Sequence, residues 1–176
     1  MRIRPLSNID LVVVHTAATI KGMNFKVSDI RQWHVVDNGW SDIGYNYVIE
    51  EDGNLEKGRE LEYVPAHAGG KFNARSIGIC LVGGINENQK AEANYSPQQY
   101  ITLRRLLEAL PVTIPSVKYL CGHRDLSDDA DGDGIIEHWE WKKECPCFDA
   151  WDWFTSDAMP AGPPHISYEF FTPKLF

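Results

Sequence analysis

The chain has 176 residues, of which 43% are hydrophobic, so it can bury one core but is too short for two large domains. Its formal net charge of −8 argues against nucleic acid as a partner, because phosphate binding needs clustered lysine and arginine side chains. No stretch approaches the roughly 20 apolar residues that span a bilayer, and residues 1–15 lack the apolar core of a signal peptide.

The N-terminal part of the chain predicts a strand and then a helix. Residues 11–14 form an apolar run typical of a strand, which would place His15 at the strand end, facing a cleft. Ser28 is a suitable N-cap for a helix over residues 29–37. His34 lies on the apolar side of that short helix, where a histidine is more often packed than coordinating.

The next segments predict a hairpin and a buried strand. Residues 44–50 alternate as a strand does, the turn residues 51–54 follow, and residues 55–59 can pair back. The continuous apolar run 76–82 is typical of a central strand covered on both faces. Its Cys80 is therefore expected to be a free core thiol, although four cysteines could in principle form disulfides.

The second half of the chain contains the clearest helix. Before it, a small-residue loop carries His67, which could line a cleft. Ser96 is a good N-cap for a helix over residues 97–110, and we expect Pro111 to end it. Residues 117–120 then predict a short strand. Strands interleaved with helices indicate an α/β fold whose sheet has mixed strand directions.

Residues 129–140 follow the twelve-residue calcium-loop pattern at every informative position. Gly134 occupies the position of the sharp turn. The expected ligands are three aspartates, one backbone carbonyl, a water-mediated glutamate and a bidentate glutamate: Asp129, Asp131, Asp133, Ile135, Glu137 and Glu140. The alternative is an acidic, solvated loop. Because nothing else in the chain repeats the pattern, we expect one structural calcium without a paired loop.

A second metal site is predicted from histidine and cysteine side chains. His15, His123 and Cys145 are of the types that zinc prefers, and three ligands with a vacant fourth position are typical of catalytic zinc. Alternatively, Cys121 and Cys147 could join His123 and Cys145 in a closed structural site without His15. The spacing of one residue within each pair would strain tetrahedral geometry there. In a third interpretation these side chains only pack.

Six segments share their residues with a known enzyme family. They are residues 15–19 (HTAAT), 31–34 (RQWH), 44–45 (GY), 67–68 (HA), 76–84 (SIGICLVGG) and 143–146 (KECP). On these segments the chain resembles the zinc-dependent N-acetylmuramoyl-L-alanine amidases, in particular the phage lysozymes of amidase type, and it is similar to the peptidoglycan recognition proteins. The matches keep chain order and cover roughly residues 8–154.

By this resemblance His15, His123 and Cys145 are the zinc ligands, and Tyr45 and Lys143 are catalytic residues that do not bind the metal. Lys143 would place a positive charge near the developing oxyanion. Tyr45 would orient the water or donate a hydrogen bond. Taken alone, these two residues could instead be a surface lysine and a half-buried strand tyrosine.

The resemblance also implies the domain organisation. An amidase domain over residues 1–157 would contain a mixed central sheet of about five strands with helices packed on it. The EF-hand-like loop 129–140 would be an insertion, because the second histidine and the cysteine are close in the phage enzymes but are separated here by 21 residues, 124–144. Residues 158–176 would form a C-terminal tail without a counterpart in the family.

The implied reaction is hydrolysis of the amide between N-acetylmuramic acid and L-alanine in bacterial peptidoglycan, which lyses the cell wall. The expected partner is peptidoglycan, with no nucleic acid and no membrane span, and we expect a monomer. Without a signal peptide, the protein would be made in the cytoplasm and would act on the wall after release or secretion.

Two other classes of function stay open at this point. Members of the recognition-protein branch bind peptidoglycan without cutting it, and they typically lack the cysteine ligand, so Cys145 together with Tyr45 favours an enzyme. Phage enzymes of this type can also bind a polymerase of their own phage, which would make the chain a regulatory protein-binding domain. Residues 1–8 show no match that supports this second alternative.

Overall fold

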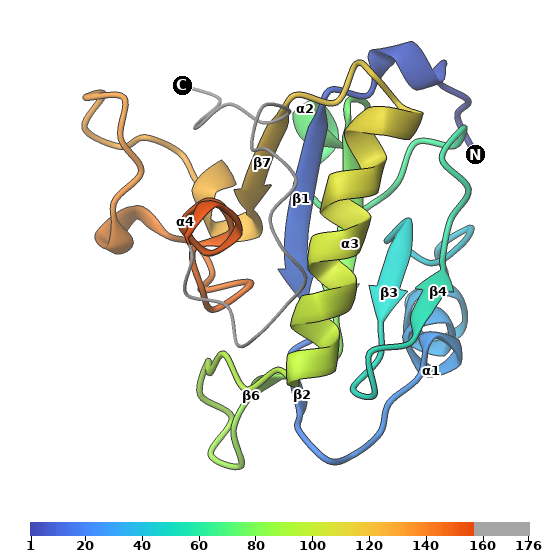
Figure 1. Ribbon diagram of the computed structural model, residues 1–176, viewed down its shortest axis with the longest axis vertical. Coiled ribbons are helices and arrows are strands. Elements are labelled where there is room, and N and C mark those ends of the chain that lie inside the picture. The colour runs from blue at the N-terminus through green and yellow to red at the C-terminus, as the bar shows by residue number, and fades with distance from the viewer. Residues whose placement is uncertain (157–176) are drawn as a thin grey trace.

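The computed structural model describes residues 1–156, so the tail expected at 158–176 lies outside the described residues. A five-stranded sheet of order β4-β3-β5-β1-β7 runs through the domain (Figure 1). Its strands are β1 (Leu11–Thr16), β3 (Tyr47–Ile49), β4 (Leu55–Lys57), β5 (Ser76–Leu81) and β7 (Tyr119–Gly122). β4 is antiparallel to β3, whereas β3, β5, β1 and β7 are parallel. The predicted α/β fold with a mixed five-stranded sheet is confirmed.

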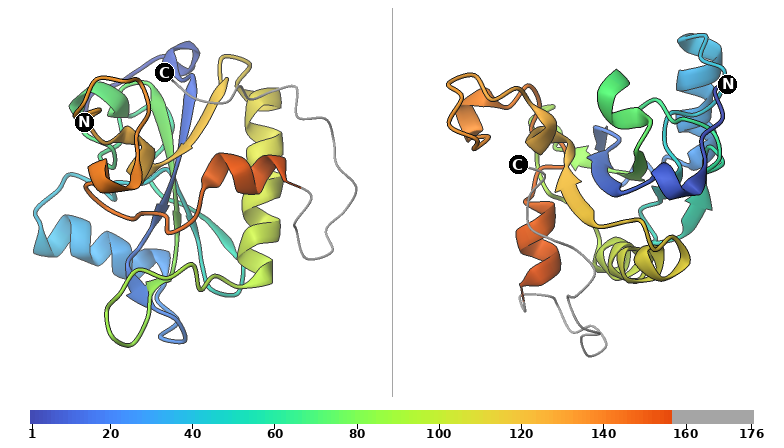
Figure 2. Two further views of the ribbon diagram at one scale, coloured as in Figure 1. Left: turned by 90° about the vertical axis from the view of Figure 1, so that its left-hand side faces the viewer. Right: turned by 90° about the horizontal axis from the view of Figure 1, so that it is seen from above.

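Helices cover both faces of this sheet (Figure 2). One face carries α3 (Pro97–Thr113) and α4 (Ala150–Thr155), and the other carries α1 (Val27–Arg31), its π-helical continuation (Gln32–Asp37) and α2 (Gly70–Asn73). A separate pair of parallel strands, β2 (Thr19–Ile20) and β6 (Gly84–Ile85), follows β1 and β5. The remaining elements are the 3-10 turns Leu6–Asn8, His123–Leu126 and His138–Glu140. Within residues 1–156, no helix has the length and apolar character needed to cross a membrane.

The alternation of side chains along β1 determines which face of the sheet receives His15. Val12 and Val14 pack in the core beneath α3, whereas Leu11 and Val13 pack in a second cluster with α2. Successive side chains of a strand point to opposite faces. His15 therefore lies on the same face as Leu11 and Val13, away from α3.

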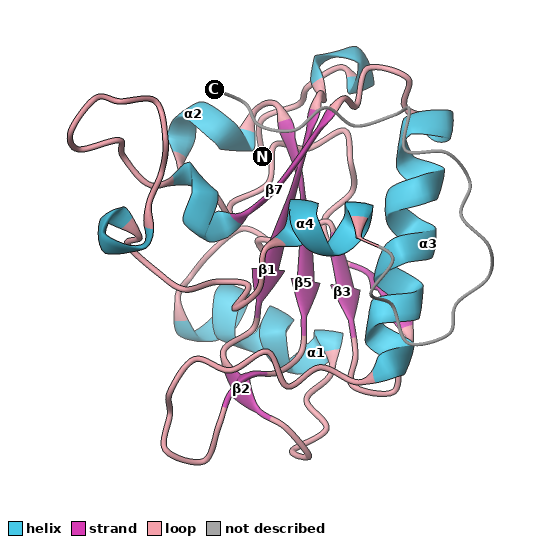
Figure 3. Cartoon of the chain, turned by 60° about the vertical axis from the view of Figure 1, so that its left-hand side comes forward, coloured by secondary structure: helices cyan, strands magenta, loops and turns pink. Residues whose placement is uncertain are grey.

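Parallel pairing brings the ends of several strands to one edge of the sheet. β1 lies between β5 and β7, and all three run in the same direction. Figure 3 shows β1, β5 and β3 side by side with their carboxyl ends at the same edge. In an open sheet with parallel strands, this edge is the usual place for a functional site.

Two helix boundaries differ from the sequence prediction. α1 begins at Val27, one residue before the predicted N-cap, because the Asp29 carboxylate accepts a hydrogen bond from the Lys26 backbone N–H at 2.7 Å and closes the helix start. α3 continues through Pro111 to Thr113. Since Pro111 lies in the final turn, its missing N–H costs a single helical hydrogen bond and does not stop the helix.

Candidate functional site

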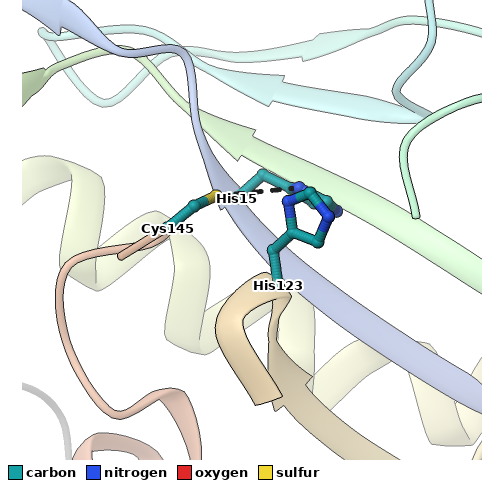
Figure 4. Close-up of side chains that lie close together, drawn as sticks. All are labelled: His15, His123 and Cys145. Carbon is teal, nitrogen blue, oxygen red and sulfur yellow. Dashed lines mark hydrogen bonds between the residues drawn. The ribbon is translucent and has the colours of Figure 1, made fainter. Parts of the chain in front are cut away.

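Three side chains converge at the carboxyl edge of the sheet (Figure 4). His15 lies in β1, His123 follows directly after β7, and Cys145 comes from the loop before α4. One nitrogen from each ring and the Cys145 sulfur all lie within 4.8 Å of one another. His15 Nδ1 is 3.8 Å from Cys145 Sγ, which also accepts the Thr16 backbone N–H at 3.2 Å. The structure therefore brings together the three residues that the sequence predicted as one group.

The electrostatic state of these groups suits a divalent cation. His15 is 1% exposed, and burial, with His67, His123 and Lys143 nearby, lowers its pKa well below the usual value. Burial and the Lys143 charge lower the pKa of His123 to about 4, and burial raises the pKa of Cys145 to about 12. At neutral pH both imidazoles are thus neutral ligands, and the thiol can exchange its proton for a metal.

The closed four-ligand alternative finds no support in the geometry. Cys121 is buried in the hydrophobic cluster with Val13 and Phe72. The Cys147 thiol instead contacts the backbone oxygen of Gly84 at 3.3 Å. Among residues 1–156, no group of potential metal ligands includes either cysteine. The group therefore consists of two histidine nitrogens and one cysteine sulfur from separate elements, which are ligand types that zinc prefers.

Tyr45 and Lys143 both lie near this group, in different environments. The Tyr45 ring centroid is 5.3 Å from that of His15. Burial, followed by the charges of Cys80 and Cys145, raises the pKa of Tyr45 well above its usual value, so its phenol keeps its proton. Lys143 is exposed, and its charge contributes to the lowered pKa values of both His15 and His123. The neighbouring Lys142 instead pairs with Asp128 at 2.5 Å.

His67 has a contact that the sequence did not predict. The sequence indicated that it could line a cleft, and in the structure its Nδ1 lies 2.8 Å from Nε2 of His15. Burial, and after it the charge of His123, lowers the pKa of His67 to about 3. Gly78 leaves the space for this ring, since a Cβ atom there would lie 2.5 Å from the imidazole. A glycine within an otherwise apolar central strand was the available signal.

The acidic loop at 129–140 projects from the side of the domain (Figure 2). Its carboxylates form two groups, Asp129 with Asp131 and Glu140, and Asp131 with Asp133 and Glu137. The Asp129 carboxylate accepts hydrogen bonds from the backbone N–H groups of residues 132 and 134. The Glu140 carboxylate accepts them from residues 130 and 137. The fold thus gathers all five predicted acidic side chains of the loop, while Ile135 is half exposed.

The comparisons with known proteins agree in one family. The family model described as N-acetylmuramoyl-L-alanine amidase matches residues 5–148. The endolysin of Enterobacteria phage T3 is 35% identical over 159 residues, which are 90% of this chain and 94% of that protein. Peptidoglycan-recognition protein SC2 of Drosophila melanogaster is 34% identical over 143 residues and covers 74% of each chain. The solved structure of the amidase LysC from Clostridium intestinale is 28% identical with a TM-score of 0.61, covering 83% of this chain and 81% of that one.

Proposed function

The chain belongs to the N-acetylmuramoyl-L-alanine amidase family, and we propose that it uses zinc to hydrolyse the amide between N-acetylmuramic acid and L-alanine in bacterial peptidoglycan. The observation that carries this proposal is the group of His15, His123 and Cys145 at the carboxyl edge of the sheet. A recognition protein needs only a surface for peptidoglycan. A group of three metal-type ligands, of which His15 and Cys145 are buried and His123 is partly buried, beside a protonated tyrosine and an exposed lysine, supports a hydrolase instead.

His15, His123 and Cys145 would be the three protein ligands of a catalytic zinc. Bound zinc would lower the pKa of a water molecule and polarise the scissile carbonyl. Cys145 must lose its proton to ligate, and two features favour the thiolate: the Thr16 N–H donates to the sulfur, and the Lys143 charge lies nearby. His15 and His123 need no such change, since their lowered pKa values keep them neutral.

Tyr45 and Lys143 supply different functions in this proposal. Because its pKa is raised, Tyr45 acts as a hydrogen-bond donor at neutral pH and not as a base. Its donor group stabilises negative charge that develops on the carbonyl oxygen of the substrate. Lys143 is exposed and adds a positive charge at the solvent side of the site, where the substrate would enter.

We further propose that residues 1–157 form the amidase domain, with the tail 158–176 appended, and that the insertion 129–140 binds a structural calcium. The twelve-residue pattern supports this, as does the gathering of its carboxylates. Partial burial and the charges of Asp133, Asp131 and Glu140 raise the pKa of Glu137, which indicates repulsion that a divalent cation would relieve.

Purified peptidoglycan tests the reaction itself. We expect the metal-loaded protein to release peptides that begin with a free L-alanine amino group while the glycan strands stay intact, as measured by product mass analysis. Cys145→Ala should abolish release. Cys147→Ala is the matched control, because this residue belongs to the same Cys-Pro-Cys segment but lies outside the ligand group, and it should stay active. Peptidoglycan that is bound by the wild type but never cleaved would show a binding module instead.

Zinc binding should release about one proton at pH 7. Cys145, with a pKa of about 12, is a protonated thiol there, whereas His123, with a pKa of about 4, already lacks its extra proton. The apparent affinity should therefore rise about tenfold per pH unit through the neutral range. Titration calorimetry in two buffers of different ionisation enthalpy measures the proton count. An unchanged proton release in Cys145→Ser would contradict the assigned ligand.

Tyr45→Phe and Lys143→Ala should each lower turnover roughly a hundredfold or more while zinc stays bound, since each removes one electrostatic or proton-handling group. Metal content and rate must be measured on the same sample. Lys142→Ala is the matched control, because this neighbouring lysine pairs with Asp128 and should be dispensable. Full activity in both catalytic variants would assign the mechanism to other residues.

Calcium at about 100 times its Kd should raise the melting temperature by roughly 5–10 °C, the shift expected for one saturated site in a domain of this size. Asp131→Ala should remove this effect and lower activity, with zinc still bound. Asp128→Ala serves as the control, because it removes an adjacent carboxylate that pairs with Lys142 and lies outside the twelve-residue pattern. The calcium proposal fails if the protein binds no calcium and its melting temperature does not change when calcium is added.

A further inference from the structure

We infer that His67 is a positioning residue that fixes the tautomer and the ring orientation of His15. The inference rests on the proposed role of His15 as a zinc ligand and goes beyond it, because His67 belongs to none of the metal-type groups. It lies behind His15, on the side of the ring away from Cys145.

The two nitrogens of His15 face different partners. Nδ1 lies 3.8 Å from the sulfur of Cys145, on the side of the ligand group (Figure 4). Nε2 lies 2.8 Å from Nδ1 of His67. The two imidazole planes meet nearly edge-on, at 81° with 4.8 Å between ring centroids. One ring nitrogen of His15 is thus free for a metal, and the other is engaged in a hydrogen bond.

The direction of that hydrogen bond follows from what a metal requires. If His67 donated to Nε2, neutral His15 would carry its proton on Nδ1, the nitrogen that faces Cys145, and could not ligate there. If His15 donates from Nε2–H, the lone pair of Nδ1 points at the ligand group. A metal-bound histidine ordinarily donates its second N–H to such a partner, which sets its tautomer. His67 Nδ1 is therefore the acceptor.

The second nitrogen of His67 completes the same arrangement. With Nδ1 accepting, neutral His67 carries its proton on Nε2, which lies 3.3 Å from the hydroxyl oxygen of Ser76. The Ser76 hydroxyl oxygen can accept a hydrogen bond from this Nε2–H group. A directed chain of hydrogen bonds then runs from Nε2–H of His15 through His67 to Ser76, and Nδ1 of His15 is left with its lone pair toward the ligand group.

The backbone around His67 is fixed by side chains of neighbouring elements. The Asn73 side-chain oxygen accepts the N–H groups of His67, at 3.1 Å, and of Ala68, at 2.8 Å. The buried guanidinium of Arg4 donates a hydrogen bond to the backbone oxygen of Asn73 at 2.9 Å. Arg4 also donates to the Ser76 backbone oxygen at 2.7 Å. Arg4 therefore holds Asn73 and Ser76, the two residues that bond to the backbone and to Nε2 of His67.

Two substitutions separate the hydrogen bond from the packing. His67→Phe keeps an aromatic ring above Gly78 but has no acceptor, whereas His67→Asn keeps an acceptor close to the Nδ1 position and loses ring volume. We expect zinc affinity, measured by competition with a chromophoric chelator, to fall about 10- to 100-fold in His67→Phe. His67→Asn should bind zinc more tightly than His67→Phe. A purely steric role predicts the opposite order, and that order would overturn the inference.

The tautomer can be read without metal or substrate. In the metal-free wild type, two-bond ¹H–¹⁵N correlation spectra should show the His15 proton on Nε2, and this preference should disappear in His67→Phe. A proton on His15 Nδ1 in the wild type would overturn the inference. The readout also separates the two hypotheses, because a wild type that binds no zinc would sink the proposed function while the metal-free spectrum still decides the role of His67.

Discussion

The site depends on the burial of one polar ring at the end of a central strand. His15 is almost completely excluded from solvent, and a buried polar group is costly unless its atoms find partners. The sheet order supplies these partners. β5 and β7 lie on the two sides of β1. His123 follows the carboxyl end of β7, whereas His67 precedes β5 and its ring packs over Gly78 within that strand. His15 thus finds a different partner for each ring nitrogen: Nε2 contacts His67 over the face of the sheet, and Nδ1 faces Cys145 in the ligand group at the carboxyl edge.

The long segment between His123 and Cys145 is closed at its base because its two ends are joined by hydrogen bonds. The Arg124 N–H donates to the Cys145 oxygen at 2.7 Å, and the Lys142 N–H donates to the Ser127 hydroxyl at 3.1 Å. These bonds form a neck from which the acidic loop projects. Closing a longer loop costs little additional entropy once its ends are held. The position of Cys145 relative to His123 is therefore set at the neck, whatever the length of the loop beyond it.

Local chemistry made much of this structure predictable from the sequence. The capping residue Ser96 accepts the Gln99 N–H as expected, and the apolar run of β5 is fully buried. The types of residues at 15, 123 and 145 indicated the metal group, because the three ligand types are recognisable without coordinates. The partnership of His67 with His15 was not predictable in this way. It joins residues 52 positions apart and depends on the space above Gly78, which only the packed sheet reveals.

The candidate site thus has two halves with different mechanical support. His15 and His67 are held from the sheet, through β1, β5 and the side chains that brace them, so their geometry is tied to the core. Cys145 and Lys143 lie at the neck, which is held by the Arg124 and Lys142 backbone bonds and by the Thr16 N–H, which donates to the Cys145 sulfur. The acidic loop ends at Glu140, three residues before Lys143. Ordering this loop would therefore act on Lys143 and Cys145, and not on His15 and His67.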